Sequence, residues 1–167
     1  MIELEMLRRL HPFKDMNENH LKKLQPKCEL VEFRKGDKLF TEGDDAAHLW
    51  VVREGSVDLR FELPDGRPTS GEMTVDSVEV EKKEPEAKIL GWSCFVPPYK
   101  MRLSAYCVTK CCKIVRVLKS DLLQLFTDDA LMGYLFMSYM IRVVGFRFHQ
   151  FQNHVSKNLG EYLMFGW

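Results

Sequence analysis

The side chains best suited to metal or redox chemistry are five cysteines and five histidines. Three of the cysteines, Cys107, Cys111 and Cys112, lie close together in the sequence. They form no C-x-x-C pair, and neighbouring residues of a strand point to opposite faces of a sheet, so Cys111 and Cys112 do not face one metal ion. We therefore expect free thiols that pack as small apolar residues, and no metal site.

The histidines form no catalytic arrangement with other residues. His149 and His154 are separated by a five-residue step, which does not place two side chains on one face of a helix. The sequence also shows no Ser-His-Asp order, no glycine-rich phosphate loop and no motif of paired carboxylates. We expect a protein that is not an enzyme.

Length and charge restrict the class of protein. A chain of 167 residues fits one compact domain, and its 46% of hydrophobic residues can form a core. Lysine plus arginine and aspartate plus glutamate both total 24, so no net charge attracts the chain to nucleic acid or to an anionic membrane. Any partner must be recognised by a local surface.

The sequence carries no pattern typical of export or of a membrane span. Charged residues from Glu3 onward interrupt the apolar N-terminal residues, which is unlike a secretory signal. The longest apolar stretch, residues 131–151, contains Arg142 and Arg147, which are costly inside a bilayer. The odd number of cysteines suits a reducing compartment, so we expect a cytoplasmic protein.

The hydrophobic pattern divides the chain into three regions of one domain. The first and last regions have helical spacing, and the middle region alternates short β-type runs with glycine turns, as in a sandwich or barrel. We expect a mainly β protein, a jelly-roll or double-stranded β-helix with short N-terminal helices and a long C-terminal helix. Within residues 1–167, the predicted regions are helices at 1–26, a β-roll at 27–118 and helices at 119–167.

Local signals predict where helices begin. Asn17 is a predicted helix cap, and Ser120 and Asp121 can cap a helix over DLLQLF. A second, longer helix is predicted over residues 128–158. The polar segment 67–88, with MTVDSVEVE as one exposed strand, is interpreted as a solvated edge or loop, and an acidic docking surface is the alternative.

One stretch of the predicted roll resembles a known family. Residues 33–59, FRKGDKLFTEGDDAAHLWVVREGSVDL, resemble the opening strands of the cyclic-nucleotide-binding domain family, which includes bacterial catabolite-activator-type regulators and protein kinase A regulatory subunits. The match includes the Gly36 turn, the Glu-Gly-Asp turn at residues 42–44 and the Gly55 turn. Tight corners of a rolled sheet require such glycines. The resemblance covers nearly the whole chain and implies a β-roll flanked by helices.

The resemblance also implies a phosphate-binding cassette in LGWSCFVPPYKMRLSA, residues 90–105. In the family, a Gly-Glu pair opens a short helix, and an arginine followed by small residues comes later. Gly91 and Arg102 stand where that pattern places them, whereas Trp92 replaces the glutamate that accepts hydrogen bonds from a ribose hydroxyl. The candidate ligand-binding residues are Gly91, Trp92, Ser93, Cys94, Arg102, Leu103 and Ser104.

Arg102 has suitable chemistry for an anionic ligand, because a guanidinium can donate two parallel hydrogen bonds to a phosphate or carboxylate. Backbone N–H groups of Ser93, Cys94 and Phe95 can add to this site if a short helix begins at Trp92. The alternative is a structural Arg102 that pairs with a carboxylate of the chain or lies at the surface. An indole accepts no hydrogen bond, so Trp92 either fills the pocket or stacks on a base.

These observations predict a small-ligand sensor or regulatory domain. It would bind a cyclic nucleotide or another small anion through Arg102 and would need no other cofactor. The alternative is a ligand-free interaction or dimerisation module. Transcription factors of the resembled class add a helix-turn-helix after the long helix, and this chain ends soon after that helix, so we expect no direct DNA binding.

We also expect a homodimer held by the helix predicted over residues 128–158. The polar residues of this helix trace one narrow stripe, and its apolar residues cover more than the roughly 100° face that a surface helix buries. The remaining apolar surface needs a partner. The resemblance implies the same, since bacterial regulators of this family pair through the equivalent helix. The alternative is that the N-terminal helix or the tail EYLMFGW folds back over this surface.

Overall fold

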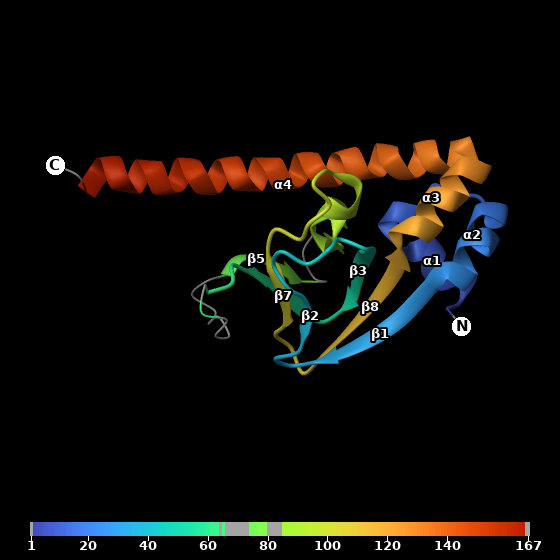
Figure 1. Cartoon of the computed structure of the whole chain (residues 1–167), viewed down its shortest axis with the longest axis horizontal. Coiled ribbons are helices and arrows are strands. Elements are labelled where there is room, and N and C mark those ends of the chain that lie inside the picture. The colour runs from blue at the N-terminus through green and yellow to red at the C-terminus, as the bar shows by residue number, and fades with distance from the viewer. Residues whose placement is uncertain (1, 64, 66–73, 80–84, 166–167) are drawn as a thin grey trace.

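The chain folds into a β-roll with helices at both ends (Figure 1). The computed structural model describes residues 2–63, 65, 74–79 and 85–165. Two antiparallel four-stranded sheets form the roll, with the strand orders β1-β8-β3-β6 and β2-β7-β4-β5. The strands are β1 (Cys28–Arg34), β2 (Lys38–Phe40), β3 (His48–Glu54), β4 (Ser56–Arg60), β5 (Thr74–Glu79), β6 (Ile89–Leu90), β7 (Ser104–Cys107) and β8 (Cys111–Leu118). The predicted jelly-roll fold class is confirmed.

The helices gather at one end of the roll, from which the last helix extends past the opposite end (Figure 1). The α-helices are α1 (Leu4–Arg9), α2 (Glu18–Leu24), α3 (Lys119–Asp128) and α4 (Ala130–Phe165). The 3-10 turns are η1 (His11–Phe13), η2 (Gln25–Lys27), η4 (Pro85–Lys88) and η5 (Trp92–Phe95). Residues 67–73 and 80–84 of the polar segment lie outside the described residues. The exposed strand predicted in MTVDSVEVE is β5, which lies at one edge of its sheet.

Two hydrophobic cores hold these layers together. The first core joins the helices to the outer face of the β1-β8-β3-β6 sheet, where Phe136 of α4 stacks on Phe13 of η1. The second core fills the roll between the two sheets, and Trp50 and Ile114 of one sheet meet Val57 of the other. Burial on both faces of the first sheet explains the continuous apolar run Leu49–Val52 in β3, in which every side chain is buried.

The predicted helix ends are partly confirmed. Asn17 caps α2, since its side-chain oxygen accepts a hydrogen bond from the His20 N–H at 2.9 Å. The predicted cap at Ser120 and Asp121 is wrong, because the chain passes directly from β8 into α3 with Leu118 as the N-terminal flanking residue. The Asp121 carboxylate instead accepts a hydrogen bond from Lys27 Nζ at 3.0 Å.

α4 is longer than the sequence pattern predicted. It begins at Ala130 rather than near 128 and continues to Phe165, well beyond residue 158. Asp129 accepts a hydrogen bond from the Met132 N–H at 3.1 Å and so stabilises the start of the helix. Residues 161–165 continue the helix, so the alternative in which this part of the tail folds back is wrong.

The structure also bears on the predictions about the cysteines and about a membrane span. All five cysteines are free, and Cys111 is exposed whereas its neighbour Cys112 is buried, as strand alternation predicted. In the described parts of the chain, none of the helices combines the length and the apolar character that a membrane span requires.

Candidate functional site

A cavity of about 510 Å³ lies between the β-roll and α4. We call it the cassette cavity, because five of the seven candidate residues line it. These five are Gly91, Trp92, Ser93, Arg102 and Leu103. Strands of both sheets supply other parts of the wall, and α4 closes one side with Arg147, Gln150 and Phe151.

Gly91 gives the cassette its shape. It links β6 to η5 with a φ of +76°, a left-handed conformation that disfavours other residues. A Cβ atom there would lie 2.4 Å from the His48 carbonyl oxygen, so the close approach also requires glycine. η5 begins at Trp92, where the sequence placed a short helix. The Cys94 N–H donates to the Gly91 carbonyl at 2.9 Å and is therefore engaged within the turn.

Arg102 is an exposed cation at this cavity. It lies two residues before β7 and lines the cassette cavity together with Leu103. Among the residues that the structure describes, its guanidinium has no hydrogen bond and no ion pair. A guanidinium without a carboxylate partner can donate both parallel hydrogen bonds to a carboxylate or phosphate.

Trp92 is a wall of the cavity. Its side chain is half-buried and packs against the helix-side core. A cavity of about 510 Å³ remains beside the ring, so the indole does not fill the space. A carboxylate acceptor is absent at this position, since the indole nitrogen only donates.

The arrangement of roll and helices matches solved structures described as cyclic-nucleotide-binding or sensor domains. A protein from Geobacter metallireducens described as cyclic-nucleotide-binding aligns with a TM-score of 0.71 and 26% identity, over 89% of this chain and 100% of that chain. A cyclic-nucleotide-binding domain from Methylobacillus flagellatus gives a TM-score of 0.71 and 17% identity, over 92% and 81%. The sensor domain of the Pseudomonas aeruginosa transcriptional regulator DNR gives 0.64 and 17%, over 89% and 90%. The chain has the cyclic-nucleotide-binding domain fold.

The family recognised from residues 33–59 is thereby confirmed at the level of the fold. No family model and no curated protein sequence matches the chain. The case for any ligand therefore rests on the chemistry of the chain's own residues.

Ser104 is a buried residue of a partly buried hydrogen-bond network and is not among the residues that line the cassette cavity. Its hydroxyl accepts from the Glu42 N–H at 2.8 Å and donates to the Glu62 carboxylate. The same carboxylate accepts from Tyr106 Oη at 2.8 Å and from Lys38 Nζ at 2.9 Å. Burial alone would raise the pKa of Glu62, but these hydrogen bonds outweigh it and lower the pKa. The network stabilises the turn at Glu42.

The lowered pKa of Glu62 predicts acid sensitivity. Because the folded pKa lies below the ordinary value of 4.5, this group stabilises the fold above that pH, and the contribution is lost as the pH falls through the folded pKa. Glu62→Gln should therefore weaken the pH dependence of the unfolding free energy below pH 4.5. Urea unfolding over a pH series measures this pH dependence. Glu5→Gln, at an exposed glutamate, is the control, and equal slopes for both variants would contradict the prediction.

α4 contributes residues to the site that the sequence analysis missed. Arg147 has a side chain only 10% exposed and forms an ion pair with Asp76 of β5. It also donates to the Gln150 Oε1 atom at 3.0 Å and to the Ile89 carbonyl at 3.3 Å. Burial lowers the pKa of Arg147, and the charge of Asp76 opposes this effect. The sequence showed only that Arg147 is a charged residue within an apolar helix, and this pattern does not indicate which residue forms an ion pair with it.

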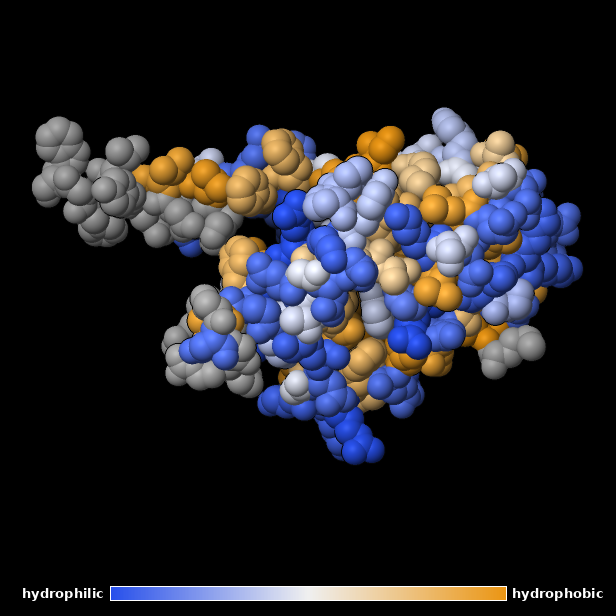
Figure 2. Space-filling model, viewed as in Figure 1, coloured by the Kyte–Doolittle hydropathy of each residue, from blue (hydrophilic) through white to orange (hydrophobic). Residues whose placement is uncertain are grey.

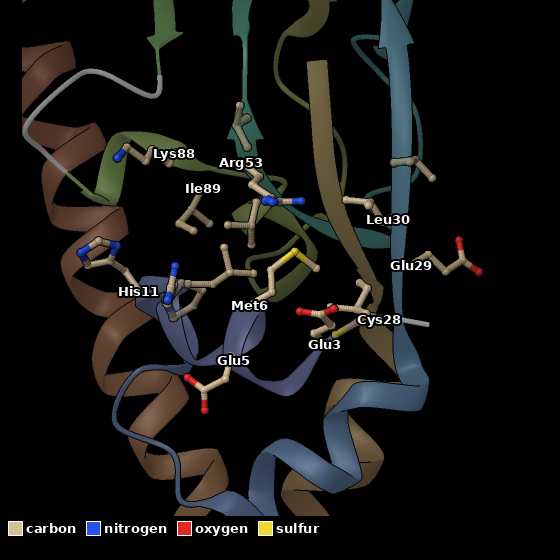
Figure 3. Close-up of a pocket in the computed structure, with 17 residues that line it drawn as sticks. Glu3, Glu5, Met6, His11, Cys28, Glu29, Leu30, Arg53, Lys88 and Ile89 are labelled. Carbon is tan, nitrogen blue, oxygen red and sulfur yellow. The ribbon is translucent and has the colours of Figure 1, made fainter. Parts of the chain in front are cut away.

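A second cavity, of about 1000 Å³, lies between α1 and the outer face of the β1-β8-β3-β6 sheet (Figure 3). Met6 and Leu30 are apolar residues of its lining, while Arg53, Lys88 and Glu3 bring charges of both signs to it. This mixture favours no single ligand charge. The cassette cavity is therefore the stronger candidate site.

Proposed function

We propose that this domain is a small-ligand sensor in which Arg102 holds the anionic group of a ligand inside the cassette cavity. The exposed guanidinium beside a cavity, without a partner among the described residues, is the observation that supports this role best. Ser93 lines the same cavity and offers a hydroxyl to the same anion. The domain would act by binding and would do no covalent chemistry.

The proposed domain pairs with a second copy through α4. Apolar residues there alternate steps of three and four, the spacing of a coiled-coil seam. The first position of the repeat is exposed and comprises Tyr134, Ile141, Phe148 and Val155. The second position comprises Met137, Val144 and Phe151. Figure 2 shows hydrophobic side chains along the part of α4 that extends past the roll. A second α4 would cover this seam, which we call the α4 seam.

The α4 seam and the cassette cavity share one residue. Phe151 belongs to the second position of the repeat and also lines the cavity. Arg147, one turn earlier, faces the cavity and is tied to Asp76 of the roll. A ligand in the cavity would therefore contact the same helix that forms the dimer, which provides a physical route from binding to assembly.

A ligand-free dimerisation module is the second candidate function. Trp92 stands in place of the acceptor that the family uses for a ribose hydroxyl, which favours loss of nucleotide binding. The exposed α4 seam would serve dimerisation with or without a ligand. This alternative predicts that anions do not stabilise the protein.

Cyclic AMP should bind weakly or not at all. Without the acceptor at Trp92, a ribose hydroxyl is left unpaired, at a cost of about 1–3 kcal/mol, or roughly tenfold to a hundredfold in affinity. Calorimetric titration of the full chain measures the affinity for cyclic AMP. A sub-micromolar dissociation constant would contradict this prediction.

The role of Arg102 is tested by thermal unfolding with inorganic phosphate, cyclic AMP and the aromatic carboxylate naphthoate. At least one of these anions should raise the Tm of the wild-type protein, and none should raise the Tm of Arg102→Ala, because only ligands that prefer the native state stabilise it. Arg34→Ala, which removes an exposed guanidinium outside the cavity, is the matched control. An unchanged response in Arg102→Ala would place the anion elsewhere, and no response to any anion would favour the ligand-free module.

A further inference from the structure

We infer that the ligand of the cassette cavity is an aromatic monocarboxylate rather than a cyclic nucleotide. This inference rests on the proposed function, because it takes Arg102 as the contact for the anion. It adds the chemistry of the remainder of the ligand, which the other walls of the cavity determine.

The walls of the cavity are mainly apolar and rich in aromatic rings. Leu59, Leu90 and Met101 are buried side chains of the lining. The aromatic rings of the lining are Phe40, Phe61, Trp92 and Phe151. Aromatic side chains pack favourably on other rings in offset or edge-to-face geometry. A flat apolar body therefore matches this surface better than a ribose does.

Among the described residues that line the cavity, one positive charge remains available to a ligand. Arg102 and Arg147 carry two positive charges, and Asp76 carries one negative charge. Asp76 forms an ion pair with Arg147 in the structure, so the charge that remains for a ligand is that of Arg102. A ligand with a single negative charge at one end complements this arrangement.

Few side-chain acceptors in the described lining remain for the hydroxyl groups of a sugar. Asp76 and the Gln150 Oε1 atom already accept hydrogen bonds from Arg147. Ser93 and Asn153 remain, whereas position 92 offers only a donor. Buried hydroxyl groups without partners weaken binding, so the lining selects against a polyhydroxylated ligand.

The size and rim of the cavity agree with a ligand of this kind. About 510 Å³ lies within the range of roughly 300–1,000 Å³ that small-molecule sites span. Phe61 and Phe151 of the lining are 49% and 62% exposed. A bound aromatic ring would cover part of this apolar surface, which is favourable in water.

Calorimetric titration of the full chain with matched probes tests the inference. Naphthoate carries a bicyclic ring and one carboxylate, naphthamide carries the same ring without charge, and acetate carries the charge without the ring. Naphthoate should bind at least about tenfold more tightly than either control, because both halves of the ligand contribute. Arg102→Ala should lower the affinity for naphthoate roughly tenfold to a hundredfold and change the affinity for naphthamide by less than about threefold. Arg34→Ala should leave the affinities for both ligands unchanged.

The remaining outcomes separate this inference from the proposed function. If cyclic AMP binds more tightly than naphthoate and Arg102→Ala abolishes its binding, the aromatic-carboxylate inference is overturned while the sensor function stands. If naphthamide binds as tightly as naphthoate, or if Arg102→Ala binds naphthoate normally, the charge contact and the inference both fail. If none of the probes binds, the inference and the sensor function are overturned together.

Discussion

Replacing Arg147 by methionine should lower the free energy of unfolding by about 3–5 kcal/mol, because it leaves a carboxylate in a poorly solvated site without its cation. The Arg147 and Asp76 side chains are only 10% and 17% exposed. Arg147 also donates to the Ile89 carbonyl and to Gln150, so its removal breaks several contacts between α4 and the roll. Urea unfolding followed by tryptophan fluorescence measures the loss.

Two further variants test whether the loss of stability comes from the buried ion pair between Arg147 and Asp76. The double variant Arg147→Met with Asp76→Asn should be less destabilised than Arg147→Met alone, because it also removes the carboxylate charge that has lost the Arg147 cation. Lys22→Met removes one partner of an exposed pair on α2, whose side chains are 57% and 60% exposed, and should destabilise the fold far less than Arg147→Met does. Wild-type stability in Arg147→Met would show that the pair does not hold α4 to the roll.

Placing aspartate at Ile141 and Phe148 should convert the proposed homodimer into a monomer. Both residues occupy the first position of the α4 seam and are 73% and 56% exposed in a single chain. In a paired α4, each aspartate would lie near its counterpart from the second copy, so burial and repulsion would both oppose assembly. The fold of each chain should be unaffected, since neither residue belongs to the described cores.

Sedimentation equilibrium at micromolar concentration measures this change. The wild-type chain should sediment with twice the 19.6 kDa of one chain, and Ile141→Asp with Phe148→Asp should sediment as a single chain. His149→Asp is the control, because it adds one aspartate at an exposed position of α4 that lies outside the α4 seam. A wild-type protein that sediments near 19.6 kDa would contradict the homodimer.

The site was only partly predictable from the sequence. Gly91 and Arg102 were found because their types and spacing resemble a family cassette, and both line the cassette cavity. Cys94 and Ser104 follow the same pattern, yet Cys94 packs in the core of the roll and Ser104 bonds to Glu62. A spacing pattern gives the order of residues along the chain, but the packing of the η5 turn and the register of β7 decide which way each side chain points.

The sequence by itself determined the elements of the fold, because turn chemistry and hydrophobic periodicity act over a few residues. Glycine at position 91 and the surplus of apolar residues on the last helix were visible in that local pattern. The tertiary structure alone decided which distant groups meet. Arg147 and Asp76 are 71 residues apart, and they pair because α4 crosses the roll at β5. Arg102 is left without a partner because, among the described residues, folding brings no carboxylate to it. Such pairings depend on the packing of whole elements, which local periodicity does not specify.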